Sequence, residues 1–465
     1  MALLIKNGEI VTGSARYVAD IWCEHQQITA IGRDLPAPEG AEVVDASGMF
    51  VFPGFIDPHT HIHLPFMGAF AKDTYATATR AAVLGGTTTV FDMCCPSKSE
   101  SPSDGFAEWK AKAAGQACCD YSFHMGITRF DDEAREQLRR IASEGMASFK
   151  IFLAYKGAFG IADSELFGAL SLAAELGAVT AVHCENETLI AELQNRHLSS
   201  GRTGPEWHHE SRPPYVEAEG VRHLMAFAEA TGAPVYIVHL SCREALEEAV
   251  RGRLRGVDVR IEALIQHLLL DKSLAELPDF EGAKFVMSPP LREIIHQGAL
   301  WNALAQGLVD TVATDHAPFD YPEQKGLGRG DFTKIPNGIP SLEERIPLLY
   351  THGVAAGRID LHRFVDVAST NAAKIFGLFP SKGTIQPGSD ADLVLFDPSY
   401  RGKLSVKSQA SEVNYNAFEG FDIVGRPAVV TVRGEVAARD GRFVGTPGRG
   451  RLIARPLRRP PGQSK

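Results

Sequence analysis

Two patterns of hydrophobic positions divide the chain. Residues 1–50 contain short apolar runs separated by glycine, proline and asparagine, which is typical of an all-β segment. From about residue 51 the pattern changes to strand followed by helix, repeated along the chain. The strands predicted in the first segment are Leu3–Lys6, Ala19–Cys23, Ile28–Ile31 and Val43–Asp45.

The repeated strand–helix pattern predicts the fold class. Its clearest helix is Ser164–Leu176, with Asp163 as the expected N-cap and Gly177 as the C-terminal stop. Eight such units over about 320 residues suit an α/β fold with a (β/α)8 TIM-like barrel better than an open doubly wound sheet. No phosphate-binding glycine fingerprint follows the first strand, which disfavours dinucleotide binding. The predicted barrel strands are Val51–His61, Thr87–Asp92, Tyr121–Thr128, Ser148–Tyr155, Val179–Glu185, Val235–Ser241, Val257–Ala263 and Thr311–His316.

After about residue 380 the β pattern returns. Gly383–Asp397 reads as two apolar strands around a glycine-rich turn, and Val429–Arg433 with Glu435–Ala438 reads as a hairpin around Gly434. We therefore expect residues 1–50 and 380–448 to form one small β-sandwich domain from both chain ends, with the barrel over residues 51–379. The tail Arg449–Lys465 is rich in arginine and proline, and we expect it to be disordered or an arm on a neighbouring subunit.

Composition excludes several classes of partner. The 465 residues carry a formal net charge of −10 with a pI near 5.9, which argues against nucleic acid or an anionic membrane as the main partner. No apolar run approaches about 18 residues, and the start of the chain lacks a signal-peptide pattern. The seven cysteines form no Cys-x-x-Cys motif, so we expect a reduced, cytoplasmic setting.

Two histidines end the first predicted barrel strand. Side chains at i and i+2 of a strand share a face, so His59 and His61 project together from its carboxyl end. Two adjacent imidazoles suit one transition-metal ion. The alternative is a pair of surface or hydrogen-bonded histidines.

Four other predicted strands carry polar residues in the same way. Lys150 lies within an apolar strand, which is costly unless its charge is removed or paired; the alternative is an edge lysine that reaches solvent. His183, His239 and Asp315 each follow a β-branched run. Any one of them alone is typical of a core residue, but five strand ends with such side chains indicate an active site at the carboxyl-terminal face of a barrel.

At these positions the chain resembles cyclic amidohydrolases of the dihydropyrimidinase / D-hydantoinase family, within the amidohydrolase superfamily. The resemblance covers nearly the whole chain and implies a distorted barrel plus a β-sandwich built from both ends. The motifs that carry it are Asp57–His61, Gly85–Thr88, Phe149–Phe152, Tyr155–Gly157, His183–Asn186, Val238–His239, Met287–Arg292, Thr314–His316, Ile335–Gly338 and Ser369–Ala372.

The resemblance also implies roles for single residues. His59, His61 and Asp315 would hold the more buried of two divalent metal ions, with zinc as the default metal, and His183 and His239 would hold the other. Lys150 would be carboxylated by CO2 or bicarbonate and would bridge both ions. A metal-bridging hydroxide would attack the ring carbonyl, Asp315 would carry its proton to the leaving nitrogen, and Tyr155 would donate to the developing oxyanion. Backbone groups at Ser288 and Asn337 would hold the amide edges of the ring.

We expect roles other than metal binding for the remaining histidines and cysteines near these motifs. We expect His63 to line the pocket rather than bind metal, His316 to be structural, and His208 and His209 to lie on the surface. Cys184 and Cys242 are expected in the core. Residues that would line the entrance for a ring substituent, with core packing as the alternative, are Leu64, Phe66, Phe152 and Phe159.

The chain differs from related families at residues 63–66, and these differences narrow the range of expected substrates. His63 stands where dihydroorotases carry an arginine, and Leu64–Phe66 differs from the allantoinase pattern. We therefore predict hydrolysis of 5,6-dihydropyrimidines or 5-monosubstituted hydantoins to N-carbamoyl amino acids. The resemblance also implies a homotetramer or homodimer. The alternatives are an allantoinase-like hydrolase of another cyclic ureide and a non-catalytic scaffold of the same fold; all the metal-ligand positions are intact, which favours an enzyme.

Overall fold

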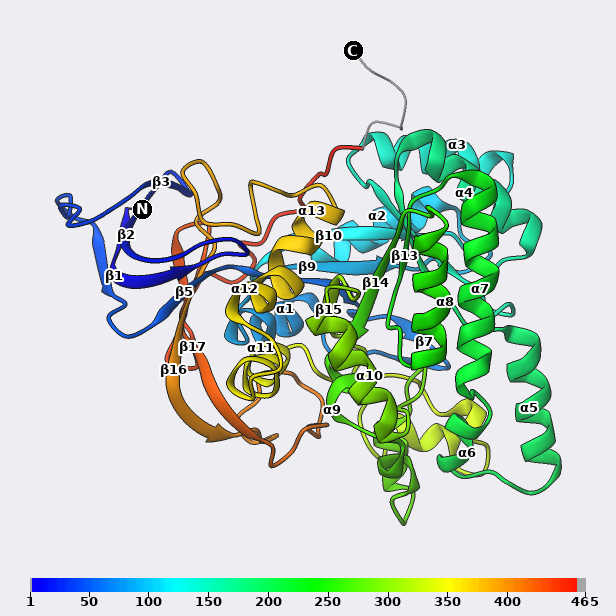
Figure 1. Ribbon diagram of the computed structural model, residues 1–465. Coiled ribbons are helices and arrows are strands. Elements are labelled where there is room, and N and C mark those ends of the chain that lie inside the picture. Colours follow the sequence, from blue (N-terminus) through cyan, green and yellow to red (C-terminus); the bar gives the residue numbers. More distant parts are fainter. Residues whose placement is uncertain (1, 458–465) are drawn as a thin grey trace.

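The computed structural model describes residues 2–457, and two sheets organise them (Figure 1). A sheet built from both chain ends lies on the left of Figure 1, and a parallel barrel with its surrounding helices lies on the right. Helices α11 to α13 lie between the two. There, Phe364 packs on both Phe52 and Phe55, with ring centroids 5.3 Å apart in each pair.

The terminal sheet has nine strands in the order β19-β18-β17-β16-β5-β1-β2-β3, with β4 paired to β1. Strand β5 joins the two chain ends, because it runs parallel to β1 and antiparallel to β16. The four predicted N-terminal strands and the hairpin around Gly434 are confirmed. The strands are β1 Leu3–Val11, β2 Arg16–Glu24, β3 Gln27–Gly32, β4 Glu42–Asp45, β5 Phe50–Pro53, β16 Leu393–Lys403, β17 Asp422–Val432, β18 Glu435–Arg439 and β19 Arg442–Phe443.

Two expectations about strands in this region are wrong. Only the second half of Gly383–Asp397 is a strand; before it, the backbone of Gly388 and Ser389 makes isolated hydrogen bonds to Ile28 of β3. The expected strand Val51–His61 is divided at Gly54, whose N–H donates to the carbonyl oxygen of Asp392 at 2.7 Å. A Cβ at Gly54 would lie 2.1 Å from Thr88 Oγ1, so only glycine fits where the chain passes from the terminal sheet into the barrel.

The barrel follows the predicted order of eight strands, and every neighbouring pair in the sheet is parallel. It closes between β6 and β15, where the Asp315 N–H donates to the His59 carbonyl and the His61 N–H donates to the His316 carbonyl, each at 2.9 Å. The barrel therefore closes at the residues that were predicted to form the active site. The barrel strands are β6 Phe55–Thr60, β9 Thr87–Cys94, β10 Asp120–Gly126, β11 Ser148–Phe152, β12 Val179–His183, β13 Val235–Ile237, β14 Val259–Leu264 and β15 Thr311–Ala313. A small ribbon, β7 Pro65–Phe66 with β8 Ala69–Phe70, follows β6.

Helices cover the outside of the barrel. Helix α4 ends at Gly177 in the left-handed conformation, as predicted, but Asp163 is its first residue rather than its cap, because Glu165 accepts the N–H of Ala162. The α-helices are α1 Tyr75–Leu84, α2 Pro102–Ala113, α3 Asp132–Ser143, α4 Asp163–Leu176, α5 Glu187–Ser199, α6 Glu206–Glu210, α7 Pro214–Thr231, α8 Arg243–Leu254, α9 Ile265–Leu269, α10 Ile294–Ala305, α11 Arg345–Leu349, α12 Leu361–Val365 and α13 Asn371–Ile375. Shorter helical turns are η1 Lys272–Glu276, η2 Glu281–Phe285, η3 Lys325–Gly328, η4 Phe332–Lys334, η5 Tyr350–Ala355 and η6 Asp366–Thr370.

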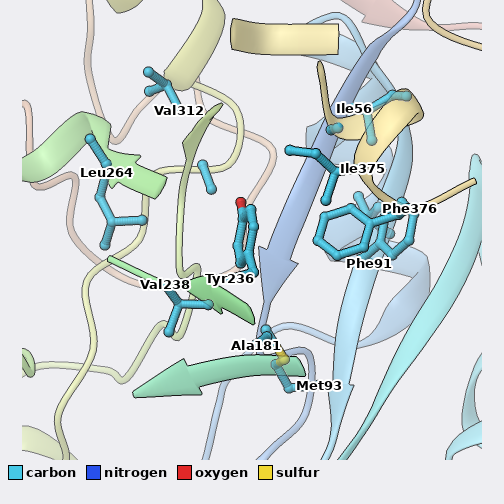
Figure 2. Packing of buried hydrophobic residues seen from close by; sticks show 14 of the residues in the cluster. Ile56, Phe91, Met93, Ala181, Tyr236, Val238, Leu264, Val312, Ile375 and Phe376 are labelled. Carbon is cyan, nitrogen blue, oxygen red and sulfur yellow. The ribbon is translucent and has the colours of Figure 1, made fainter. Parts of the chain in front are cut away.

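The amino-terminal mouth of the barrel is filled from α13. Figure 2 shows Phe376 facing Phe91, and its ring lies 5.1 Å from the rings of Phe91 and Tyr236. The Asn371 side chain donates to the carbonyl of Asp310, just before β15. Because apolar side chains fill this mouth, an active site is expected at the opposite, carboxyl-terminal mouth of the barrel.

The described part of the tail lies against its own barrel. The N–H of Tyr121 donates to the Arg451 carbonyl at 2.9 Å, and the Ile453 N–H donates back to Tyr121 at 2.8 Å. Arg455 is buried and donates to Ser122 Oγ at 2.8 Å. The expectation of disorder is thus wrong for residues 449–457, which lie against the chain's own barrel; residues 458–465 of the expected tail lie outside the described residues. Within residues 2–457 no helix has the length and apolar character needed to cross a membrane.

Candidate active site

Three of the predicted metal ligands lie together where the barrel closes. Asp315 Oδ1 is 3.0 Å from His59 Nε2 and 3.1 Å from His61 Nε2, and the two Nε2 atoms are 3.3 Å apart. Asp315 follows β15 in the left-handed conformation, with φ of 49°, which turns its carboxylate toward the histidines. Burial opposes its ionisation, but the two imidazoles hold the pKa of the Asp315 carboxyl well below its usual range.

Glu262 on β14 orients His59. Its Oε1 accepts His59 Nδ1–H at 2.7 Å and the backbone N–H of His239 at 2.9 Å, while its Oε2 accepts the Tyr236 hydroxyl at 2.6 Å. An ionised carboxylate only accepts hydrogen bonds, so His59 carries its proton on Nδ1. Nε2, on the side of Asp315 and His61, is therefore the nitrogen of His59 that is left to bind a metal ion.

The other two histidines form a second group. His183 Nδ1 lies 3.0 Å from His239 Nε2. On its other side, His183 Nε2 donates to Glu185 Oε2 at 2.9 Å, and Arg212 donates to the same oxygen at 2.5 Å. Burial raises the pKa of Glu185, but Arg212 and His183 together lower it below its ordinary value. Glu185 therefore stays ionised and accepts from Nε2, so the Nδ1 lone pair of His183 lies on the side of His239.

Lys150 lies in the same cavity as these groups. Its side chain is fully buried, and within the described chain its Nζ has no hydrogen-bond partner. Burial lowers its pKa. The alternative of an edge lysine that reaches solvent is therefore wrong. An unpaired buried amine beside the imidazoles fits a lysine whose charge has been removed.

The donor set fits divalent transition metals. Imidazole nitrogens and carboxylate oxygens suit Zn²⁺, Mn²⁺ or Co²⁺, and the atoms of His59, His61 and Asp315 all lie within 4.8 Å of one another. The nitrogens turned away from this set on His59 and His183 donate to carboxylates, an arrangement common around metal-binding histidines.

The cavity has a polar edge and an apolar wall. On the polar edge, Asn337 Nδ2 donates to the Tyr155 hydroxyl at 3.2 Å and to Ser288 Oγ at 3.0 Å. Phe66, Tyr155, Phe159 and Asn337 also line an outer cavity of about 710 Å³. The apolar wall contains all the residues expected at the entrance: Leu64, Phe66, Phe152 and Phe159.

Three of the remaining histidine predictions are wrong. The ring of His63 stacks on Phe70 at 5.2 Å and lies outside both cavities, so it does not line the pocket. His208 and His209 are buried rather than on the surface, because α6 packs into the molecule and the His208 ring lies 2.8 Å from the Met287 carbonyl oxygen. Cys184 and Cys242 are buried, as expected.

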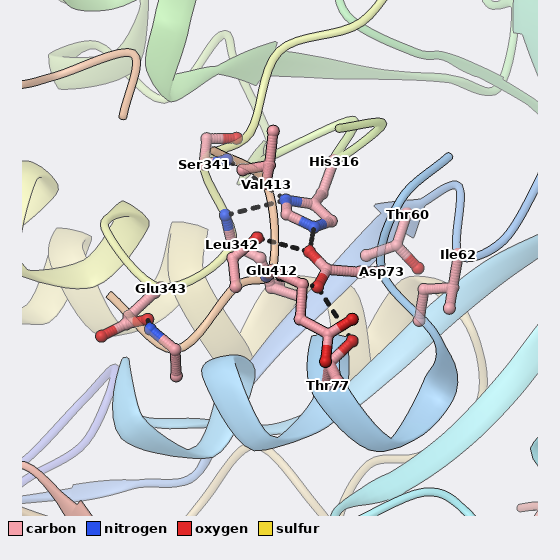
Figure 3. A network of polar contacts seen from close by, with 12 residues as sticks. Thr60, Ile62, Asp73, Thr77, His316, Ser341, Leu342, Glu343, Glu412 and Val413 are labelled. Carbon is pink, nitrogen blue, oxygen red and sulfur yellow. Dashed lines mark hydrogen bonds and ion pairs between the residues drawn. The ribbon is translucent and has the colours of Figure 1, made fainter. Parts of the chain in front are cut away.

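His316 is structural, as expected. Figure 3 shows its Nδ1 facing the backbone of Ser341 and Leu342, whose N–H groups donate to it at 3.2 and 3.3 Å. Its Nε2 then donates to Asp73 at 3.0 Å, and Asp73 also accepts the N–H of Glu412. This network joins the end of β15 to a distant loop.

Sequence reasoning missed the carboxylates behind the histidines. Glu262 occupies an apolar strand much as Lys150 does, and that local signal could have identified it. Glu185 lies in the motif that carries the resemblance, but its contact with Arg212 has no local signal.

Comparison with known proteins gives a consistent result. Residues 50–437 match the profile of the amidohydrolase family. The chain is 47% identical over 456 residues to a D-hydantoinase of Geobacillus stearothermophilus, covering 98% of this chain and 97% of that protein. It is 40% identical over 460 residues to a dihydropyrimidinase of Rattus norvegicus, covering 97% and 88%. The solved structure of a D-hydantoinase (dihydropyrimidinase) from Thermus sp. superimposes with a TM-score of 0.97 at 57% identity, covering 98% and 99%. For an L-hydantoinase (dihydropyrimidinase) from Arthrobacter aurescens the TM-score is 0.88 at 29% identity, covering 97% and 99%.

Proposed function

The chain belongs to the amidohydrolase family, and from that premise we propose that it opens the ring amide of 5,6-dihydropyrimidines or 5-monosubstituted hydantoins to give N-carbamoyl amino acids. It is a hydrolase that acts on C–N bonds of cyclic amides, and its substrates are small molecules. The observation that carries the proposal is the convergence of His59, His61, His183, His239, Asp315 and the buried, unpaired amine of Lys150.

Family membership implies a divalent-metal site, and we propose that it holds two ions, with zinc as the default. His59, His61 and Asp315 would hold one ion, and His183 and His239 the other. Lys150, carboxylated by CO2 or bicarbonate, would offer one oxygen to each. When bound, such ions lower the pKa of water and polarise a carbonyl group. The unpaired Nζ of Lys150 supports the carboxylated form, because an ammonium cannot bind a cation.

The protein's own groups handle protons and developing charge. The two imidazoles keep the carboxylate of Asp315 ionised, and this carboxylate would take a proton from the attacking water and pass it to the leaving nitrogen. Burial raises the pKa of Tyr155, which keeps its hydroxyl protonated. That hydroxyl would donate to the oxygen that gains charge in the transition state.

Ring binding and substituent binding are assigned to different walls. Backbone groups at Ser288 and Asn337 would hold the amide edges of the ring. The apolar wall would contact the exocyclic substituent, and because apolar pockets discriminate weakly between similar apolar groups, we expect broad substrate use.

A hydrolysis panel of dihydrouracil, 5-substituted hydantoins, allantoin and dihydroorotate, run beside metal analysis, tests the proposal. We expect turnover of the first two classes with two metal equivalents per subunit. Much faster turnover of allantoin or dihydroorotate would point to another cyclic ureide or imide. A folded, metal-free protein with no turnover would point to a scaffold.

A further inference from the structure

Lys325, the first residue of η3, is a lysine that the proposed chemistry does not use. Its side chain is fully buried, with Phe319 nearby at 5.8 Å from Nζ to the ring centroid. Burial lowers the pKa of Lys325 well below its ordinary value, and among the described residues no charged group offsets this effect. Burying a lysine in this way costs free energy unless its hydrogen-bond contacts compensate for the lost hydration.

Those contacts are three backbone carbonyls. Lys325 Nζ donates to the carbonyl oxygens of Val286 at 2.9 Å, Pro336 at 2.7 Å and Gly338 at 2.7 Å. A neutral amine has two N–H donors and an ammonium has three. Burial favours the neutral amine, but three carbonyl acceptors at these distances match the three donors of an ammonium, and a neutral amine would turn its lone pair toward one of them.

The three carbonyls belong to the two segments proposed to hold the ring. Pro336 and Gly338 flank Asn337 directly, and Val286 precedes Ser288 by two residues. The segments also contact each other, because the N–H of Gly338 donates to the Val286 carbonyl at 2.9 Å. The Lys325 ammonium is therefore the centre that joins both sides of the ring-binding edge.

The position of these segments relative to Asp315 is also restricted. A Cβ at Gly338 would lie 2.1 Å from the carbonyl oxygen of Ala317, two residues beyond Asp315. The backbone at Gly338 thus packs directly against the chain that leaves β15. A shift at this point would change the distance between the ring-binding edge and the catalytic carboxylate.

We propose that Lys325 is a positioning residue for ring binding, whose ammonium holds the Val286–Ser288 and Pro336–Gly338 segments at the spacing that a cyclic amide requires. This inference rests on the proposed function. Lys325 touches neither the ring nor the metal ligands in this arrangement. Its effect is to assemble the binding edge before substrate arrives, so that binding does not have to order it.

The first test replaces Lys325 with methionine, which keeps an unbranched chain and removes the donors. The matched control is Lys334→Met in the same loop, where the lysine side chain is 70% exposed and pairs with Asp331. For Lys325→Met we expect the wild-type metal content, a KM for hydantoin or dihydrouracil raised at least about tenfold, and a smaller fall in kcat. For Lys334→Met we expect wild-type values. A folded Lys325→Met enzyme with wild-type KM would overturn the inference.

A second measurement on the wild-type enzyme covers the case in which Lys325→Met does not fold. Hydrogen–deuterium exchange without substrate should show slow exchange in the peptide that contains the Gly338 amide, because that amide is bonded to Val286 beside the ammonium. Fast exchange there would show that the edge is not assembled in advance. Failure of the proposed function looks different: the wild-type enzyme itself would open no cyclic amide.

Discussion

Replacing Glu262 with glutamine removes a charge behind His59 while it keeps the size of the side chain. Oε1 accepts from His59 Nδ1 and from the His239 N–H, and Oε2 accepts the Tyr236 hydroxyl, whose oxygen also lies 2.5 Å from Thr311 Oγ1. In the variant, the amide oxygen would take the Oε1 position, since two donors point there. The amide nitrogen could then donate to the Tyr236 oxygen, whose own proton could turn to Thr311. The hydrogen-bond pattern survives, and the charge does not.

The size of the effect follows from that lost charge. A hydrogen bond to a charged group contributes about 1.5–3 kcal/mol, against about 0.5–1.5 kcal/mol for a neutral one. The difference of about 1–1.5 kcal/mol corresponds to about a tenfold loss of metal affinity at the His59 site. Substitutions of residues that orient metal-binding histidines typically lower metal affinity or activity by about 10–100-fold, which agrees with this value.

The assay is metal affinity by chelator competition, with turnover measured at saturating metal. We expect Glu262→Gln to bind its metal 10–100-fold more weakly and to recover most of its turnover when metal is in excess. Glu247→Gln, at an exposed carboxylate on α8, is the control and should match the wild type. Wild-type metal affinity in folded Glu262→Gln would refute the argument that this carboxylate sets the donor strength of His59.

Three further predictions concern the site, the fold and the assembly. Lys150→Ala and Lys150→Arg should both lose metal and activity while remaining folded, and bicarbonate should speed reconstitution of the metal-free wild type; two bound metals and near-normal turnover in Lys150→Ala would contradict this. Gly54→Ala should lower the free energy of unfolding by about 1–3 kcal/mol in denaturant titrations, because its Cβ would meet Thr88 and Asp392. An unchanged unfolding midpoint would show that the backbone between β5 and β6 can move to accept a Cβ. Light scattering should report a homotetramer or homodimer, and a monodisperse monomer would exclude both.

Much of the barrel and the strand-end chemistry could be predicted because the signals are local. An apolar, β-branched run that ends in a histidine or carboxylate identifies both a strand and its carboxyl end, as at His183, His239 and Asp315. The period of two along a strand places His59 and His61 on one face. The resemblance supplied the residue roles, which remain proposals.

The sequence by itself determined the order of elements and which strand ends carry polar side chains, since both depend on residues close together in the chain. Tertiary structure alone decided what those side chains meet. Glu262 and His59 are separated by 203 positions, and their hydrogen bond exists because β6 and β14 belong to one closed barrel. The break at Gly54 and the burial of His208 likewise depend on partners that no short stretch of sequence reveals. Hydrophobic periodicity reports which face of an element is buried, whereas register, barrel closure and packing fix the distances between faces.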